Sequence, residues 1–213
     1  MAEGAGPVKV SRDSEKSQER ILRAATAEFA RYGLGGARVD RIAERAGANK
    51  RMLYYYFGNK DALFLAALEA SYAQIRSAEL TLDLEHLDPR AALRRLVAFT
   101  WDYFLAHPEF MTLLNSENLH MGRHVARSRR IRQLHSPLVG MLRRILGRGE
   151  RLGLFRRGVD PVQLYISIAG EGYFYLSNRY TLSRIFGRKL MTRAALATRA
   201  RHNTRMILDA LRK

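Results

Sequence analysis

VDRIAERAGANKRMLYYYFGNKD, residues 39–61, is the stretch of sequence that decides the fold. Its apolar residues, spaced three and four apart, predict a short helix from Val39 to Ala46, which Gly47 ends. Asn49 is a good N-cap for a second short helix, from Lys50 to Tyr56. Two short helices around one glycine are typical of a helix-turn-helix, so the stretch predicts DNA binding.

Further helices are predicted on both sides of this stretch. From Glu19 to Tyr32 apolar residues recur at helical spacing, and Gly33 follows them. Asn59 caps a helix from Lys60 to about Leu80, and beyond it the prolines that divide segments of helical period are Pro89, Pro108, Pro137 and Pro161. No segment alternates like a strand. The predicted fold class is all-α, with about nine helices.

The chain divides into three predicted regions. Residues 1–17 mix glycine, serine, proline and charge without apolar periodicity, which predicts a flexible basic arm. Residues 18–63 form the three-helix, helix-turn-helix DNA-binding domain. Residues 64–213 form a larger helical domain for ligand sensing and dimerisation.

Composition narrows the class of protein. The 213 residues are 47% hydrophobic, enough for a core, and the absence of cysteine excludes disulfides and thiolate metal sites. The sequence has neither a signal peptide nor an apolar run long enough for a membrane span, so we expect a cytoplasmic protein. Its net charge of +17 favours nucleic acid as the partner. Residues 1–63 hold only 12 Lys and Arg against 8 Asp and Glu, so charge alone does not locate the DNA site.

The second short helix has two faces. Lys50, Arg51 and Met52 occupy the first turn, which a recognition helix exposes to base edges. The residues expected on the inward face are Leu53, Tyr56 and Phe57. Tyr54 and Tyr55 lie between the faces, where a phenol can contact sugar or phosphate.

The runs 39–50 and 53–61 resemble the signature of TetR-type (TetR/AcrR) bacterial transcriptional regulators, and the match covers residues 19–64. The resemblance implies a homodimer with an all-helical regulatory domain and assigns DNA contacts to the start of the first short helix, the second short helix and Lys60. Two positions depart from the family pattern. Arg38 replaces the small hydroxyl residue that commonly caps the first short helix, and Arg51-Met52 replaces a common pair of small residues in the second. The operator sequence therefore cannot be inferred from those of relatives. The candidate DNA-binding residues are Arg38, Asn49, Lys50, Arg51, Met52, Tyr54, Tyr55 and Lys60.

The patterns and the resemblance together predict a sequence-specific transcriptional regulator that binds double-stranded, near-palindromic operator DNA as a dimer and is released by a small-molecule effector. The resemblance implies that the regulator is a repressor. The alternative is a DNA-binding regulator without such an effector. The sequence shows neither a serine nucleophile elbow nor a glycine-rich phosphate loop, so we expect no enzyme and no cofactor.

Aromatic and polar residues of the C-terminal region are candidates for the effector site. They are Trp101, Tyr103, Phe104, Phe110, Leu114, Glu117, Asn118, Met121, Tyr165 and Phe174. Their alternative role is simply helix core. The region from Leu134 to Tyr175 also resembles a branch of the family that regulates pyrimidine and heteroaromatic catabolism, which implies a small effector of heteroaromatic or anionic character.

Other C-terminal features leave alternatives open. The segment 160–175, with Gly170 and Gly172, and a last helix from about Lys189 to Arg212 predict half of a dimer bundle or an intramolecular hairpin. His120 and His124 are four residues apart, but further metal ligands are not identifiable, so we predict a structural role and no metal site. The eleven arginines within residues 121–157 predict either an anion-binding surface that draws ligand or touches DNA flanks, or a solvated face.

Overall fold

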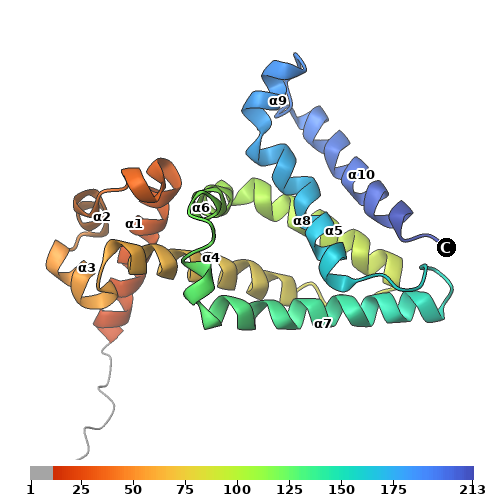
Figure 1. Ribbon diagram of the computed structural model, residues 1–213, viewed down its shortest axis with the longest axis horizontal. Coiled ribbons are helices and arrows are strands. Elements are labelled where there is room, and N and C mark those ends of the chain that lie inside the picture. Colours follow the sequence, from red (N-terminus) through yellow and green to blue (C-terminus); the bar gives the residue numbers. More distant parts are fainter. Residues whose placement is uncertain (1–11) are drawn as a thin grey trace, which may run out of the picture.

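A computed structural model describes residues 12–213, and within that range it contains helices and loops but no strand. The helices are α1 (Arg12–Gly36), α2 (Val39–Ala46), α3 (Lys50–Phe57), α4 (Lys60–Leu80), α5 (Pro89–Ala106), α6 (Pro108–Leu119), the 3₁₀ turn Val125–Arg127, α7 (Arg129–Arg151), α8 (Pro161–Ser177), α9 (Arg179–Ile185) and α10 (Arg193–Ala210). Figure 1 shows a small N-terminal head, α1–α3, joined to a longer helical body. The all-α prediction is confirmed.

The head forms as the periodicity predicts, with one correction at its start. Residues 12–17, assigned to the flexible arm, belong to α1; residues 1–11 lie outside the described residues. Gly33, at φ +65°, breaks the helical course of α1, a conformation that costs glycine little. The side chains that pack α1, α2 and α3 together include Ile21, Phe29, Ile42 and Leu53.

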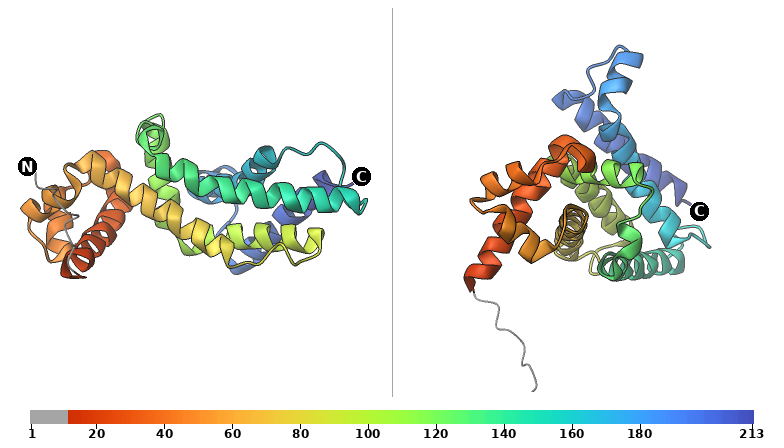
Figure 2. Two further views of the ribbon diagram at one scale, coloured as in Figure 1. Left: turned by 90° about the horizontal axis from the view of Figure 1, so that it is seen from below. Right: turned by 60° about the vertical axis from the view of Figure 1, so that its left-hand side comes forward.

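Helix α4 belongs to both parts of the protein. It starts in the head and runs along the body beside α7 (Figure 2), so the boundary predicted at residue 63 falls inside it. The core of the head also continues into the body, because Leu113 of α6 and Ile131 of α7 pack in the same buried cluster as Phe64. A shift of α6 would therefore move a side chain that packs in the core of the head.

Helix α8 crosses α5, α9 lies at the far end of α8, and α10 runs back towards the body (Figure 1). Residues 12–213 contain ten α-helices, slightly more than the nine or so predicted. Helix α9 follows α8 after the single residue Asn178, with no proline or glycine to mark the junction. The last helix starts at Arg193, where the Thr192 side chain accepts a hydrogen bond from the backbone N–H of Ala195, rather than at Lys189.

Part of the predicted dimer surface packs inside the protomer instead. Gly172 allows α8 to approach α5, since a Cβ there would lie 3.2 Å from the Phe104 ring. Ile207 and Leu211 of the C-terminal segment are buried in the core of the body. Gly170 is exposed. Across residues 12–213, no helix is both long and apolar enough to cross a membrane.

Candidate DNA interface and effector site

The start of α3 is built to present its first turn. The Asn49 side chain accepts a hydrogen bond from the backbone N–H of Met52 at 2.9 Å, and Leu53 is buried beneath the helix. This anchoring leaves Arg51 and Tyr55 exposed, the latter by 82%. Tyr54 is also exposed, while Tyr56 packs on the core as predicted.

Met52 departs from its predicted exposure. It is half-buried and packs against the core of the head. Met52 lies four residues before Tyr56, so the two side chains share the face of α3 that packs on the core. Met52 therefore supports the recognition helix more than it offers a side chain to bases.

Asp40, in the first turn of α2, holds two of the candidate DNA-binding cations. Its carboxylate forms an ion pair with Lys50 and lies 3.7 Å from the Arg38 guanidinium. The hydrogen bond with Lys50 lowers the pKa of Asp40, and the charge of Arg38 adds to the effect. Asp40 thus holds both cations on one exposed surface. The sequence analysis did not assign this role to Asp40.

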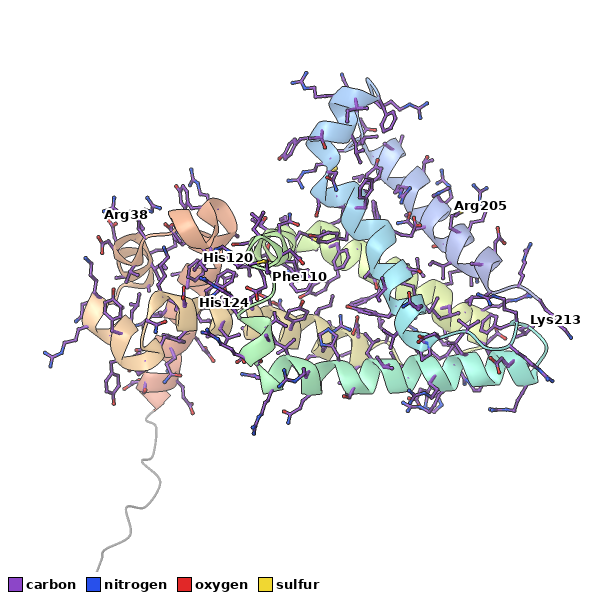
Figure 3. The ribbon with its side chains drawn as sticks, viewed as in Figure 1. Arg38, Phe110, His120, His124, Arg205 and Lys213 are labelled. Atoms are coloured by element: carbon purple, nitrogen blue, oxygen red, sulfur yellow. The ribbon has the colours of Figure 1, made fainter. Side chains whose placement is uncertain are left out.

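Arg38 does not cap α2 with its side chain. The buried carboxylate of Glu28 on α1 accepts hydrogen bonds from the Arg38 backbone N–H, at 3.1 Å, and from Arg41 Nε, at 2.6 Å. Glu28 therefore joins α1 to the start of α2 and compensates for the missing hydroxyl cap. Figure 3 shows Arg38 at the outer edge of the head.

Lys60 lies beside the recognition helix at the N-terminus of α4. The Asn59 side chain caps α4 by accepting a hydrogen bond from the backbone N–H of Ala62. Lys60 Nζ donates a hydrogen bond to the carbonyl oxygen of Gly35 at 3.3 Å. A lysine at a helix N-terminus suits phosphate binding, because the unpaired backbone N–H groups there also attract anions. The structure thus brings all eight candidate DNA-binding residues to the head.

The predicted effector residues do not form one group. Trp101, Tyr103, Phe104 and Phe110 are buried together in the body. Leu114 packs against the same cluster and Tyr165 borders the neighbouring one, both half-buried. The residues that lie on the exterior are Asn118, Met121 and Phe174.

Glu117 has a structural role. Its buried carboxylate accepts hydrogen bonds from the backbone N–H groups of His124 and Val125, and it pairs with His124 Nδ1 at 2.6 Å. His120 Nδ1 lies 2.7 Å from the Ser116 carbonyl oxygen. Figure 3 places both histidines where head and body meet. Residues 12–213 contain no cluster of ligating side chains that could hold a metal ion.

The buried polar residues of α4 were missed by the sequence analysis. Arg76 and Glu79 are 5% and 3% exposed and form an ion pair of 2.9 Å. The only sequence signal was their spacing of three residues on the apolar side of a helix. Tyr72 and His135 pack nearby, with ring centroids 5.2 Å apart.

Several arginines of residues 121–157 have local partners. Arg123 lies 3.6 Å from Asp61, Arg144 pairs with Glu85, and Arg148 donates to the Leu87 carbonyl oxygen at 2.9 Å. The contacts of Arg144 and Arg148 attach the loop before α5 to α7, and the contact of Arg123 attaches the loop after α6 to α4. They account for part of the arginine content without invoking DNA.

Family models match both parts of the chain. The model described as "Bacterial regulatory proteins, tetR family" matches residues 21–67, and "Tetracyclin repressor-like, C-terminal domain" matches residues 89–207. The chain belongs to the TetR family. The predicted function, that of a DNA-binding transcriptional repressor with a helix-turn-helix, is confirmed.

Individual TetR relatives agree with this assignment. The transcriptional repressor NicS of Pseudomonas putida is 43% identical over 187 residues, 88% of each chain. The repressor SCO4008 of Streptomyces coelicolor is 41% identical over 112 residues, 53% of this chain and 55% of its own. The structure of SCO4942 from the same organism has the same fold, with a TM-score of 0.69 at 24% identity, covering 92% of this chain and 98% of that one.

Proposed function

We propose that this TetR-family regulator binds a near-palindromic operator as a homodimer and releases it when a small-molecule effector enters the body. No catalytic step is part of this function. Because operator DNA is part of the chromosome, we expect the protein to act in the cytoplasm.

The contact between α6 and the head carries the proposal. Ser116 Oγ accepts a hydrogen bond from the Leu34 backbone N–H at 3.2 Å, directly after the break in α1 at Gly33. At its other end α6 contributes Phe110 to the buried aromatic cluster. One helix therefore touches both the interior of the body and the support of the DNA-binding helices, so a ligand that moves α6 changes how the head is held.

An exposed apolar stripe on α8 supports a second copy of the chain as the partner. Val162, Ile166, Gly170 and Phe174 follow one another at four-residue spacing, and Ile166 and Phe174 are more than half exposed. Gly170 would let two such helices approach closely. A two-fold dimer through this stripe has two recognition helices for half-sites about 34 to 36 Å apart.

Another regulator of this fold has been solved as a complex with a small molecule. The structure of FadR from Bacillus subtilis, a complex with stearoyl-CoA, has a TM-score of 0.66 at 15% identity and covers 91% of this chain and 98% of that one. This likeness supports a small-molecule effector for a regulator of this fold and leaves its chemistry open.

Selection from a random double-stranded DNA library at near-physiological salt tests DNA recognition. We expect a two-fold symmetric consensus, bound far more tightly than random DNA. Enrichment without symmetry would contradict the dimer, and no enrichment would leave only charge-driven association. The selected operator then serves as a probe for compounds that release it; a regulator with no responding compound is the alternative outcome.

Sedimentation velocity tests the dimer surface. Ile166→Glu should shift the protein to monomer, because it buries a charge in the proposed interface. Leu152→Glu, which changes an exposed leucine outside that stripe, is the control and should leave the dimer intact. A dimer that tolerates Ile166→Glu would mean another face is used.

A further inference from the structure

Arg76 is buried with part of its hydrogen-bonding capacity unused. Its Nη2 donates to the hydroxyl oxygen of Tyr165 at 3.2 Å, and its Nη1 is 2.9 Å from a Glu79 oxygen. Among the residues that the structure describes, Nε and Nη1 nevertheless make no well-aligned hydrogen bond, and neither does Glu79 Oε2. A buried guanidinium normally uses its donors, since leaving them unpaired costs free energy. The guanidinium therefore has unused donors that could bind another acceptor if Glu79 moved away.

A cavity of about 210 Å³ opens beside this pair, between α4 and α7. Arg76 and Glu79 line it together with apolar side chains from both helices, which are Leu80, Leu134, Pro137, Leu138 and Met141. An apolar cavity of about 150 Å³ can hold benzene. The volume therefore suits a molecule with a single ring, and the guanidinium selects an anion.

Two titratable groups close to Arg76, Tyr72 and His135, are neutral near pH 7 and so do not form ion pairs with it. Burial raises the pKa of Tyr72 to about 12, and burial lowers the pKa of His135. Tyr165 contributes a hydroxyl and a ring whose centroid is 5.3 Å from the Arg76 guanidinium carbon. The carboxylate that pairs with Arg76 in this structure is therefore that of Glu79.

We propose that Arg76 binds the carboxylate of a small one-ring anion, the effector, and that Glu79 takes up a proton as it loses its ion pair. The proposal rests on the proposed function, because it names the effector class for the body.

Glu79 is suited to this exchange by its surroundings. Burial raises the pKa of its carboxyl to about 7, against the attraction of Arg76. The other groups that face it are Tyr103 on α5 and Arg130, which lines the same cavity from α7. A second carboxylate on Arg76 would leave Glu79 as a buried anion next to an anion, which favours its protonated form. Effector affinity should therefore fall as the pH rises above about 7.

The site also touches the helix that contacts the head. Tyr72, one turn before Arg76 on α4, packs edge-to-face on Phe110 of α6, with ring centroids 5.5 Å apart. Two turns further along α6, Ser116 accepts the hydrogen bond from Leu34. Arg76 is thus connected to α6 through Tyr72, one turn away on α4, and its contact with Phe110.

Calorimetric titration of the full-length protein tests the ligand class. The probes are benzoate and the pyridine monocarboxylates, each paired with its primary amide, at pH 6, 7 and 8. We expect at least one carboxylate to bind ten-fold or more tighter than its amide, and to weaken by up to about ten-fold from pH 7 to pH 8. Carboxylates that bind no better than their amides would overturn the proposal.

Variants assign the effect to the pair. Arg76→Gln combined with Glu79→Gln removes both charges together, avoids stranding one of them, and should abolish the preference for carboxylate while operator affinity stays within two-fold. Glu79→Gln alone should bind the carboxylate more tightly at pH 8 and lose the pH dependence. Arg143→Gln, which changes an exposed arginine of α7 outside the lining of this cavity, is the control and should change affinity less than two-fold.

The outcomes separate this proposal from the proposed function. A compound that releases the operator equally well from wild type and from the double variant would overturn the Arg76 site and leave effector control standing. A carboxylate that binds in the expected way without releasing the operator would support the site and contradict effector control through it.

Discussion

Glu28 Oε1 lies 2.6 Å from Arg41 Nε, which pairs an almost completely buried carboxylate on α1 with a half-exposed guanidinium on α2. The same oxygen accepts the Arg38 backbone N–H. The entry to the helix-turn-helix therefore depends on a residue ten positions earlier in the chain. Arg41 also lies over the ring of Tyr32, 4.2 Å from its centroid, which holds α1 and α2 together.

Replacing Glu28 by alanine should weaken the head. The change leaves the Arg38 N–H and Arg41 without their acceptor, a loss of about 1 to 3 kcal/mol in the free energy of unfolding. Urea denaturation measures it, with Glu44→Ala on the exposed face of α2 as the control, expected within about 0.5 kcal/mol of wild type. Equal losses for both variants would show that the Glu28 contacts contribute nothing specific.

Replacing Arg51 by alanine should change which operators are preferred. Arg51 is exposed on the first turn of α3, and a guanidinium that binds a guanine contributes about 1 to 3 kcal/mol of discrimination. Library selection with both proteins measures the change base by base. Identical sequence preferences would remove Arg51 from the base-reading residues.

Replacing Lys60 by alanine should weaken binding to all DNA sequences to a similar degree. A phosphate contact carries no base information, and its loss lowers the slope of log affinity against log salt by about 1. Titration of operator and random DNA over a range of salt concentrations measures both effects. A loss confined to the operator would instead indicate a base contact.

Gly149 should not tolerate a side chain. A Cβ there would lie 1.9 Å from the buried Phe155 ring, so Gly149→Ala must displace the ring and should destabilise the body by about 1 to 3 kcal/mol or more. Gly147, on the same helix, has only the flexible end of Arg151 within reach, at 3.7 Å. Gly147→Ala should stabilise by about 0.5 to 1 kcal/mol, and thermal unfolding compares the two. Similar melting temperatures would contradict the packing of Phe155 on α7.

Replacing Glu79 by glutamine should change the pH dependence of stability. The folded pKa of about 7 exceeds the ordinary value of 4.5, so the folded protein binds the extra proton between these values. Stability contributed by protonated Glu79 is present below pH 4.5 and is lost as the pH rises to about 7. From pH 5 to pH 8, Glu79→Gln should therefore gain about 2 kcal/mol relative to wild type. A constant difference across this range would mean that Glu79 is not perturbed.

The sequence by itself determined the features that depend on neighbours within about four residues. Asn49 and Asn59 cap α3 and α4 through hydrogen bonds to backbone N–H groups three residues ahead. The inward position of Leu53 follows from helical periodicity. Because such contacts are made within one turn, composition and spacing reveal them, and the helix-turn-helix and the exposure of Lys50 and Arg51 were predictable.

Only the tertiary structure decided the features that join distant segments. Arg76 donates to Tyr165, 89 positions away, and Leu34 donates to Ser116, 82 positions away. Glu117 looked like a ligand residue, yet the fold placed His124 against it. Burial and pairing of such groups depend on which helix faces meet, and a one-residue rotation of a helix turns a side chain by about 100° to a different neighbour.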